Sequence, residues 1–134
     1  MDAVSSYAEL RRQEATAPKT LYAVDGRCTP ESPVTDVAVL AGLARAAVDA
    51  GGGHVLDTSH VIFPNGAITL VLILAESHLS IHTWPEEDLI AVDLFSCGAI
   101  DGRAVLDRLA GSLKLAELTV RQVSRGLPAA PAAT

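Results

Sequence analysis

Residues 67–97 read AITLVLILAESHLSIHTWPEEDLIAVDLFSC, and this stretch decides the predicted fold. It opens with an apolar run through Ala75, which is typical of a buried strand. Residues 78–83 alternate polar and apolar side chains, a pattern that predicts a strand with one buried face. A turn over residues 84–88 contains Pro85, and residues 89–97 are again strand-like. The stretch therefore predicts three consecutive strands joined by hairpin-length connections.

The flanking sequence adds strands predicted over residues 21–25, 54–63 and 117–123, and helices predicted over residues 36–50 and 101–114. Gly26 is expected to end the first strand. Thr35 or Asp36 can cap the first helix, and the glycines at 51–53 stop it. The order β-α-β-β-β-β-α-β predicts an α+β fold, a two-layer sandwich with both helices on one face of an antiparallel sheet. The uncovered face would need a partner or would have to be polar, and we expect a homodimer.

Composition and charge limit the function classes. The chain of 134 residues has a net charge of −6 and no run of Lys or Arg, which disfavours nucleic acid and anionic membranes as partners. Its longest apolar run is far shorter than the roughly 20 residues of a membrane-spanning helix. Two cysteines and no recognisable secretion signal favour a cytoplasmic protein. We predict one domain over residues 20–125, between a flexible leader, 1–19, and a disordered tail, 126–134.

Reactive side chains concentrate in residues 74–98. A hairpin centred near Glu86 and Glu87 pairs position 77 with position 96 or 97, so Ser77 and Cys97 are expected at the same end of it. Taken singly, these residue types have ordinary structural roles, such as a serine at a turn or a cysteine filling a core. Spacing alone leaves both interpretations open.

Two sequence blocks in this region resemble the prokaryotic S-adenosylmethionine decarboxylases. The family motif Glu-Ser-His-Leu-small-Ile-His-Thr-Trp-Pro-Glu stands here as ESHLSIHTWPE over residues 76–86. The block Ala-Val-Asp-Leu-Phe-small-Cys-Gly follows as AVDLFSCG over residues 91–98. The family's early Gly-x-His-Leu segment is missing its histidine, since residues 19–28 read KTLYAVDGRC. The resemblance implies a dimer and an antiparallel sheet with paired helices, and a proenzyme that cuts itself to make a pyruvoyl cofactor.

The resemblance places the cut between Glu76 and Ser77. The Ser77 hydroxyl would attack the preceding carbonyl, and elimination and hydrolysis would follow. This would leave a β chain of residues 1–76 and an α chain of residues 77–134 that begins with a pyruvoyl group. That group would form a Schiff base with the substrate amine and accept electrons as carbon dioxide leaves. The product, decarboxylated S-adenosylmethionine, would supply aminopropyl groups for polyamines such as spermidine.

Five further residues match family positions with a role in processing, proton transfer or substrate binding. His82 would assist proton removal during processing, and Thr69, where the family usually has serine, would support it. Cys97 would return a proton to the substrate carbon. Glu86 would bind the ribose hydroxyls, and Phe63 would stack on adenine. Structural roles are assigned to the other histidines and to the first cysteine: His54, His60, His78 and Cys28.

Several alternatives remain at this level. The substrate-side sequence departs from the family, which leaves arginine or ornithine as possible substrates, with the acidic residues 86–88 or Asp57 meeting the distal cation. A non-enzymatic relative that serves as a binding or regulatory subunit is a second alternative. A Cys–His hydrolase built on Cys97 and His82 lacks a nucleophile-turn motif. A zinc site from His78, His82 and Cys97 lacks supporting spacing, so no metal is expected.

Overall fold

The computed structural model describes residues 17–128, which form six strands, two α-helices and one short 3-10 helix. In chain order these are β1 (Lys19–Arg27), α2 (Val37–Ala50), β2 (Val55–Ile62), β3 (Ile68–Leu74), β4 (Ser77–Trp84), η1 (Pro85–Glu87), β5 (Leu89–Cys97), α3 (Gly102–Leu113) and β6 (Glu117–Arg125).

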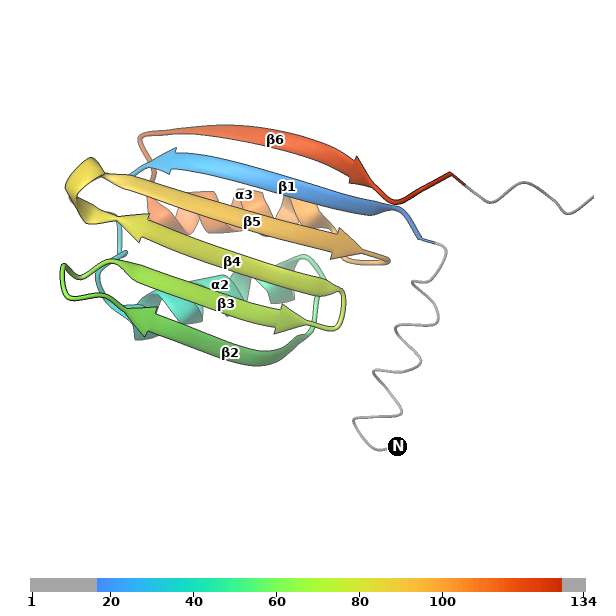
Figure 1. The fold of residues 1–134 in the computed structure, drawn as a ribbon, viewed down its shortest axis with the longest axis horizontal. Coiled ribbons are helices and arrows are strands. Elements are labelled where there is room, and N and C mark those ends of the chain that lie inside the picture. The colour runs from blue at the N-terminus through green and yellow to red at the C-terminus, as the bar shows by residue number, and fades with distance from the viewer. Residues whose placement is uncertain (1–16, 129–134) are drawn as a thin grey trace, which may run out of the picture.

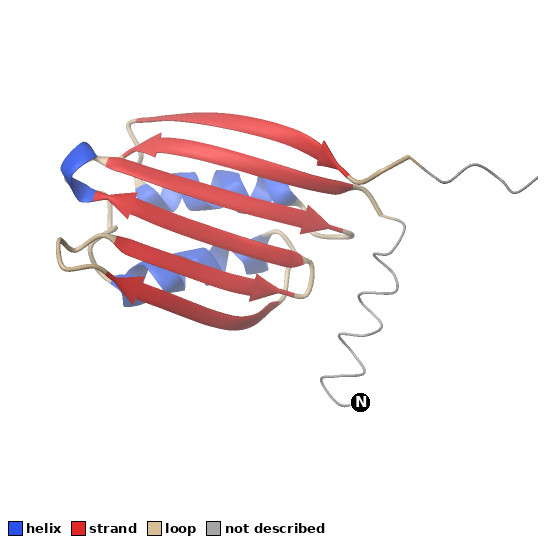
Figure 2. Ribbon diagram, in the orientation of Figure 1, coloured by secondary structure: helices blue, strands red, loops and turns tan. Residues whose placement is uncertain are grey.

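The six strands form one sheet in the order β2-β3-β4-β5-β1-β6, and every neighbouring pair is antiparallel. Both helices lie behind the sheet in Figure 1, so one face is covered and the other is open. Figure 2 shows the same two layers by secondary structure. The predicted α+β two-layer sandwich is therefore confirmed.

Strand β1 is longer than predicted, and the expectation that Gly26 ends it is wrong. Gly26 lies inside the strand, paired with Ile90 of β5 and Leu118 of β6. A Cβ atom at this position would come within 2.6 Å of Leu115 Cδ1, so glycine here gives room for close packing rather than ending the strand. Strand β6 is also longer than predicted and continues to Arg125, because Arg125 still pairs with Lys19 of β1. Most of the predicted leader and tail (residues 1–16 and 129–134) lies outside the described residues.

The covered face holds the core. Side chains that pair across antiparallel strands point to the same face, so the register defines rows of residues. One such row runs through Leu72, Leu79 and Leu94, all completely buried, and continues to the buried Tyr22. The helices complete this core with the buried side chains Leu40, Ala44, Ala47 and Val48 of α2 and Val105, Leu106, Leu109 and Leu113 of α3.

Leu79→Ala is expected to lower the free energy of unfolding by about 2–5 kcal/mol, because a fully buried leucine leaves a cavity that the tight core cannot close. Urea unfolding of chains that also carry Ser77→Ala measures this on a single polypeptide. Val39 on α2 is 44% exposed, so Val39→Ala serves as the control with an effect within about 0.5 kcal/mol. Equal midpoints for the two variants would contradict the packing described.

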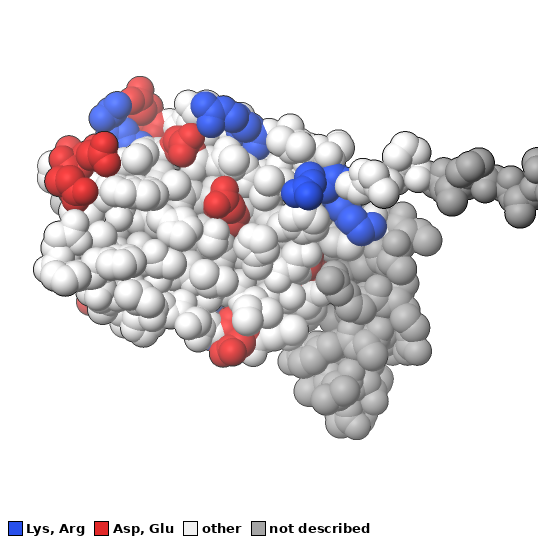
Figure 3. Space-filling view, viewed as in Figure 1, with Lys and Arg blue, Asp and Glu red and all other residues white. Residues whose placement is uncertain are grey.

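The open face is largely uncharged. One row crosses all six strands as Val61, Thr69, His82, Ala91, Asp25 and Thr119. A second runs as Asp57, Ile73, His78, Phe95, Leu21 and Val123. Figure 3 views this face, where most atoms belong to residues other than Lys, Arg, Asp and Glu, and charged side chains gather mainly toward its edges. Ile73, Val61 and Val123 are each about half exposed here, at 47%, 53% and 48%. A largely uncharged sheet face with half-exposed aliphatic side chains is typical of a surface that meets a partner.

Candidate active site

Ser77 lies at the first position of β4, directly after a two-residue turn made by Ala75 and Glu76. Leu74 and Ser77 close this β3–β4 hairpin as its last paired residues. Two-residue hairpins normally place positive φ angles in the turn itself. Here the positive value falls on Ser77, with φ at 140°. A residue with a side chain rarely adopts such an angle, and holding it there costs on the order of 1–3 kcal/mol.

Glu76 precedes this strained serine and is the one buried charged side chain within residues 17–128, with an exposed fraction of 2%. The His54 backbone N–H donates to Glu76 Oε1 at 2.9 Å, and His54 Nδ1 lies 2.7 Å from Oε2. Sequence reasoning gave His54 no contact with the site. The two residues are 22 positions apart and share no local pattern, so only the three-dimensional path of the chain reveals the pair.

Cys97 lies at the same end of the β4–β5 hairpin as Ser77. His78 pairs with Phe95, and continuing this register places Ser77 opposite Ser96, with Cys97 one residue beyond. The predicted register is therefore confirmed. Cys97 is buried, with an exposed fraction of 4%. We refer to Glu76, Ser77 and Cys97 as the serine end of the site.

A cavity of about 560 Å³ lies at the opposite end of β4. Its lining includes four residues that the sequence singled out, Phe63, Thr69, His82 and Glu86, together with Trp84. We refer to the four as the pocket end. Thr69 Oγ1 and His82 Nδ1 are hydrogen-bonded at 3.1 Å, which orients the imidazole. The His82 and Trp84 ring centres are 6.2 Å apart.

Two exposed groups complete the pocket end. Phe63 is 46% exposed, so its ring is available to stack on a planar ligand. Asn65 Nδ2 donates to Glu86 Oε2 at 3.4 Å, a contact that the sequence did not indicate and that holds the carboxylate beside the cavity.

The two ends do not meet within one chain, although the sequence suggested one compact group. His82 is five residues beyond Ser77 on the same strand, which corresponds to about 16 Å at the usual rise of a β-strand. In Figure 1 the β3–β4 turn and the β4–β5 turn stand at opposite sides of the sheet. The chain therefore carries two separate groups of candidate residues, the serine end and the pocket end, at opposite ends of β4.

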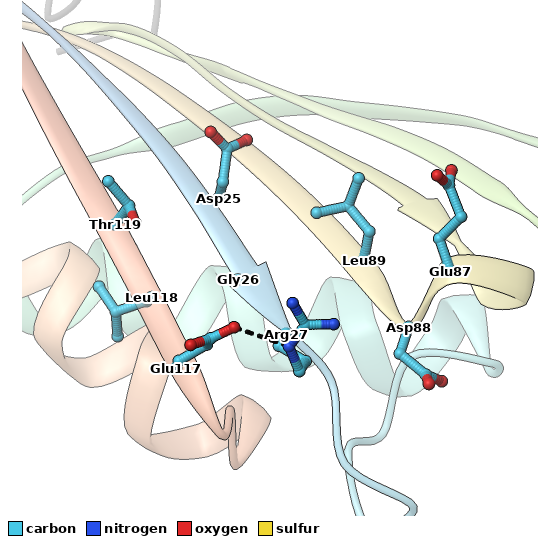
Figure 4. Close-up of a pocket in the computed structure, with 9 residues that line it drawn as sticks. All are labelled: Asp25, Gly26, Arg27, Glu87, Asp88, Leu89, Glu117, Leu118 and Thr119. Carbon is cyan, nitrogen blue, oxygen red and sulfur yellow. Dashed lines mark hydrogen bonds and ion pairs between the residues drawn. The ribbon is translucent and has the colours of Figure 1, made fainter.

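A second hollow of about 440 Å³ lies at the β1–β6 side of the β4–β5 turn and is lined by Asp25, Arg27, Glu87, Asp88 and Glu117, among others (Figure 4). It contains none of the predicted catalytic residues. Arg27 Nε contacts Glu117 Oε1 at 2.7 Å, and Arg121 Nη1 contacts Asp25 Oδ2 at 3.3 Å, so two carboxylates already have cationic partners. The acidic residues 86–88 are thus divided between two cavities, because Glu86 lines the other one.

Nothing in the described surroundings of Cys28 or His78 indicates a catalytic role. Burial, and secondly the Asp88 carboxylate, raises the pKa of the Cys28 thiol, which disfavours a reactive thiolate there. His78 stacks on Phe95 with ring centres 6.2 Å apart, and Arg125 Cζ lies 5.7 Å from the centre of the same Phe95 ring. Within residues 17–128 no group of three or more His, Cys, Asp or Glu side chains is placed to hold a metal. No helix of that described region is long and apolar enough to cross a membrane.

Comparisons with known proteins identify the family. The family model for S-adenosylmethionine decarboxylase matches residues 20–126. The chain is 38% identical over 82 residues to S-adenosylmethionine decarboxylase proenzyme 2 of Bacillus anthracis, covering 60% of this chain and 67% of that one. It is 34% identical over 102 residues to the S-adenosylmethionine decarboxylase proenzyme of Pyrobaculum arsenaticum, covering 75% of this chain and 78% of that one.

The crystal structure of the adenosylmethionine decarboxylase from Aquifex aeolicus has the same fold. The TM-score is 0.73 at 23% identity, and the match covers 88% of this chain and 98% of the other. Family model, sequence relatives and fold lead to the same assignment, and the chain belongs to the S-adenosylmethionine decarboxylase family.

Proposed function

We propose that this protein cuts its own backbone between Glu76 and Ser77 and then decarboxylates S-adenosylmethionine with the pyruvoyl group made from Ser77. The observation that carries the proposal is the placement of Ser77. It follows a buried glutamate at a hairpin turn and holds a φ of 140°, inside a motif that the family shares. The product is decarboxylated S-adenosylmethionine, an aminopropyl donor for polyamine synthesis.

The cut needs no oxidant. The Ser77 Oγ–H bond breaks as Oγ attacks the Glu76 carbonyl carbon, and the Glu76–Ser77 C–N bond breaks to leave an ester and a free amine. Loss of the Ser77 Cα proton then expels the Glu76 carboxylate and leaves a dehydroalanine. One water molecule hydrolyses its imine tautomer, releasing ammonia and leaving a pyruvoyl group. The strained φ of Ser77 favours this path, because the torsion no longer exists once the Glu76–Ser77 C–N bond has broken.

The surroundings of Ser77 fit a covalent pyruvoyl group. Residue 77 is half-buried at a strand end, and the buried Cys97 is its near neighbour across the hairpin. When present, a pyruvoyl carbonyl supplies an electron sink for the bond that releases carbon dioxide. Cys97 is the residue that we propose returns a proton to the substrate carbon, since its burial excludes bulk water from that exchange.

The pocket end suits the adenosyl part of the substrate. Phe63 offers an exposed aromatic face for adenine, and Glu86 offers carboxylate oxygens for ribose hydroxyls. His82, held by Thr69, is the group that we propose removes the Ser77 Cα proton during processing. A cavity of about 560 Å³ lies within the usual range for small-molecule sites.

A homodimer joins the two ends, and we propose that it forms through the open face. Two copies with this face packed on itself, related by a two-fold axis that runs across the strands, would place the serine end of one chain against the pocket end of the other. The half-exposed Ile73, Val61 and Val123 would become buried between the sheets. The separation of about 16 Å along β4 is the reason why one chain alone would leave the site incomplete.

The comparisons support S-adenosylmethionine as the substrate rather than arginine or ornithine. The Bacillus anthracis and Pyrobaculum arsenaticum relatives are named for S-adenosylmethionine, and the family model covers most of the chain. Asp57 lies on β2, while Glu87 and Asp88 line the hollow away from the pocket end, so the acidic groups do not converge on one distal cation.

Purified protein is expected to release carbon dioxide from carboxyl-labelled S-adenosylmethionine and not from labelled arginine or ornithine. Cys97→Ala should still be cut but should lower kcat by about 100-fold or more, because general acid catalysis contributes roughly 10²–10⁴-fold. Cys28→Ala is the matched control and should keep the wild-type kcat. Release from arginine or ornithine alone would overturn the assigned substrate, and full kcat in Cys97→Ala would remove the proton-donor role.

A further inference from the structure

We propose that His54 is a positioning residue for self-cleavage, acting as a clamp on Glu76 that fixes the carbonyl to be attacked. The inference rests on the proposed function, since it concerns how the cut between Glu76 and Ser77 is prepared. Neither the sequence motif nor the proposed catalytic residues include His54.

Three hydrogen bonds join His54 to the two turn residues. The Ala75 backbone N–H donates to the His54 carbonyl at 2.9 Å. The His54 backbone N–H donates to Glu76 Oε1 at 2.9 Å, and its ring Nδ1 lies 2.7 Å from Oε2. Both carboxylate oxygens of Glu76 therefore have a partner on the same residue, so the side chain is held at two points rather than one.

In the contact between His54 and Glu76, only the Glu76 side chain is buried. The Glu76 side chain is 3% exposed, whereas the His54 side chain is 54% exposed. A buried carboxylate without donors would be strongly disfavoured, so His54 is what makes this burial tolerable. Gly53 lets the two segments approach, because a Cβ there would lie 3.4 Å from Glu76 Oε1 and 2.7 Å from both Ile100 Cδ1 and Val48 Cγ1.

Fixing Glu76 fixes the scissile peptide. The residue before Glu76 is held by the hydrogen bond from the Ala75 N–H to the His54 carbonyl, and the Glu76 side chain is held by its two bonds to His54. The residue after Glu76 is held by the pairing of Ser77 with Leu74. The Glu76 carbonyl then has little freedom to rotate away from the Ser77 hydroxyl, and the positive φ of Ser77 cannot relax. Intramolecular attack is sensitive to such alignment, and a displacement of about 1 Å can lower a rate about 100-fold.

The test compares two side chains of similar size at position 54. His54→Asn keeps an N–H donor close to the place of Nδ1, whereas His54→Leu has none. Freshly translated precursor is sampled over time and analysed by intact-protein mass spectrometry. We expect His54→Leu to be cut about 10-fold or more slowly than wild type and His54→Asn to recover most of the rate. His60→Ala, an exposed histidine on β2, is the control and should be cut at the wild-type rate.

Thermal melting of the same variants combined with Ser77→Ala shows that each is folded at the assay temperature. Glu76→Gln gives a second test, because it keeps an acceptor for the His54 N–H but removes the charge that Nδ1 meets, and it should also be cut slowly. Equal rates for His54→Leu, Glu76→Gln and wild type would overturn the clamp alone. A wild-type chain that is never cut would overturn the proposed function, and the clamp with it.

Discussion

Wild-type protein is expected to give two masses in intact-protein mass spectrometry, one for residues 1–76 and one for residues 77–134, whereas Ser77→Ala gives one uncut mass. Alanine has no oxygen to attack the Glu76 carbonyl, so the effect is expected to be complete. The downstream fragment should be lighter than an N-terminal serine would make it, by one molecule of ammonia. Carbon dioxide release from S-adenosylmethionine should be lost in the same variant, because no pyruvoyl group can form.

Ser80 provides the matched control for this experiment. It is a second serine on β4, its exposed fraction is 8%, and it pairs with Val71 and Asp93 within the strand rather than at its end. Ser80→Ala should therefore be cut as wild type is. A single full-length chain in folded wild-type protein, shown by a cooperative melting transition, would count against self-processing and in favour of a non-enzymatic relative.

Much of the fold could be predicted because it depends on local patterns. The alternation in residues 78–83 determines which side chains of β4 face the core, and Leu79 and Ile81 are indeed fully buried. The short acidic turn fixes the β4–β5 register, and this gives the proximity of Ser77 to Cys97 without any structure. Gly26 was misjudged because glycine has two uses, as a strand breaker and as a place for close packing, and only Leu115 from a distant segment decides between them.

The candidate site was less predictable because its parts depend on relations across the sheet. The alternation predicted a strand for His82 but left Ser77 just outside it, and the structure shows that both lie on β4, about 16 Å apart at the usual rise of a strand. The His54–Glu76 contact and the Asn65–Glu86 contact both join residues more than 20 positions apart, at 22 and 21. No periodicity reports such contacts. They follow from the paths of β2 and of the β2–β3 turn.

The separation of the two ends makes a strong prediction about subunits. If the serine end of each chain meets the pocket end of its partner, Ser77 and His82 that act together belong to different chains. Ser77→Ala and His82→Ala should each fail to be cut when expressed alone, since the first lacks the nucleophile and the second loses roughly 10²–10⁴-fold of proton-transfer assistance. A mixed dimer, however, contains one complete site.

Co-expression of the Ser77→Ala and His82→Ala chains should therefore restore cleavage, and only of the His82→Ala chain. That chain retains Ser77, and its partner supplies His82 with the supporting Thr69. Intact-protein mass spectrometry identifies which chain is cut, because the downstream fragment carries alanine at position 82. A double variant, Ser77→Ala with His82→Ala, co-expressed with His82→Ala is the control and should give no cleavage.

If neither chain is cut in the mixed dimer, the two residues act within one chain, and the open face does not assemble the site. If His82→Ala is cut alone, His82 is not the processing base. Cleavage restricted to the His82→Ala chain would show that the largely uncharged open face and the divided site serve one purpose, which is to complete catalysis across two copies of the chain.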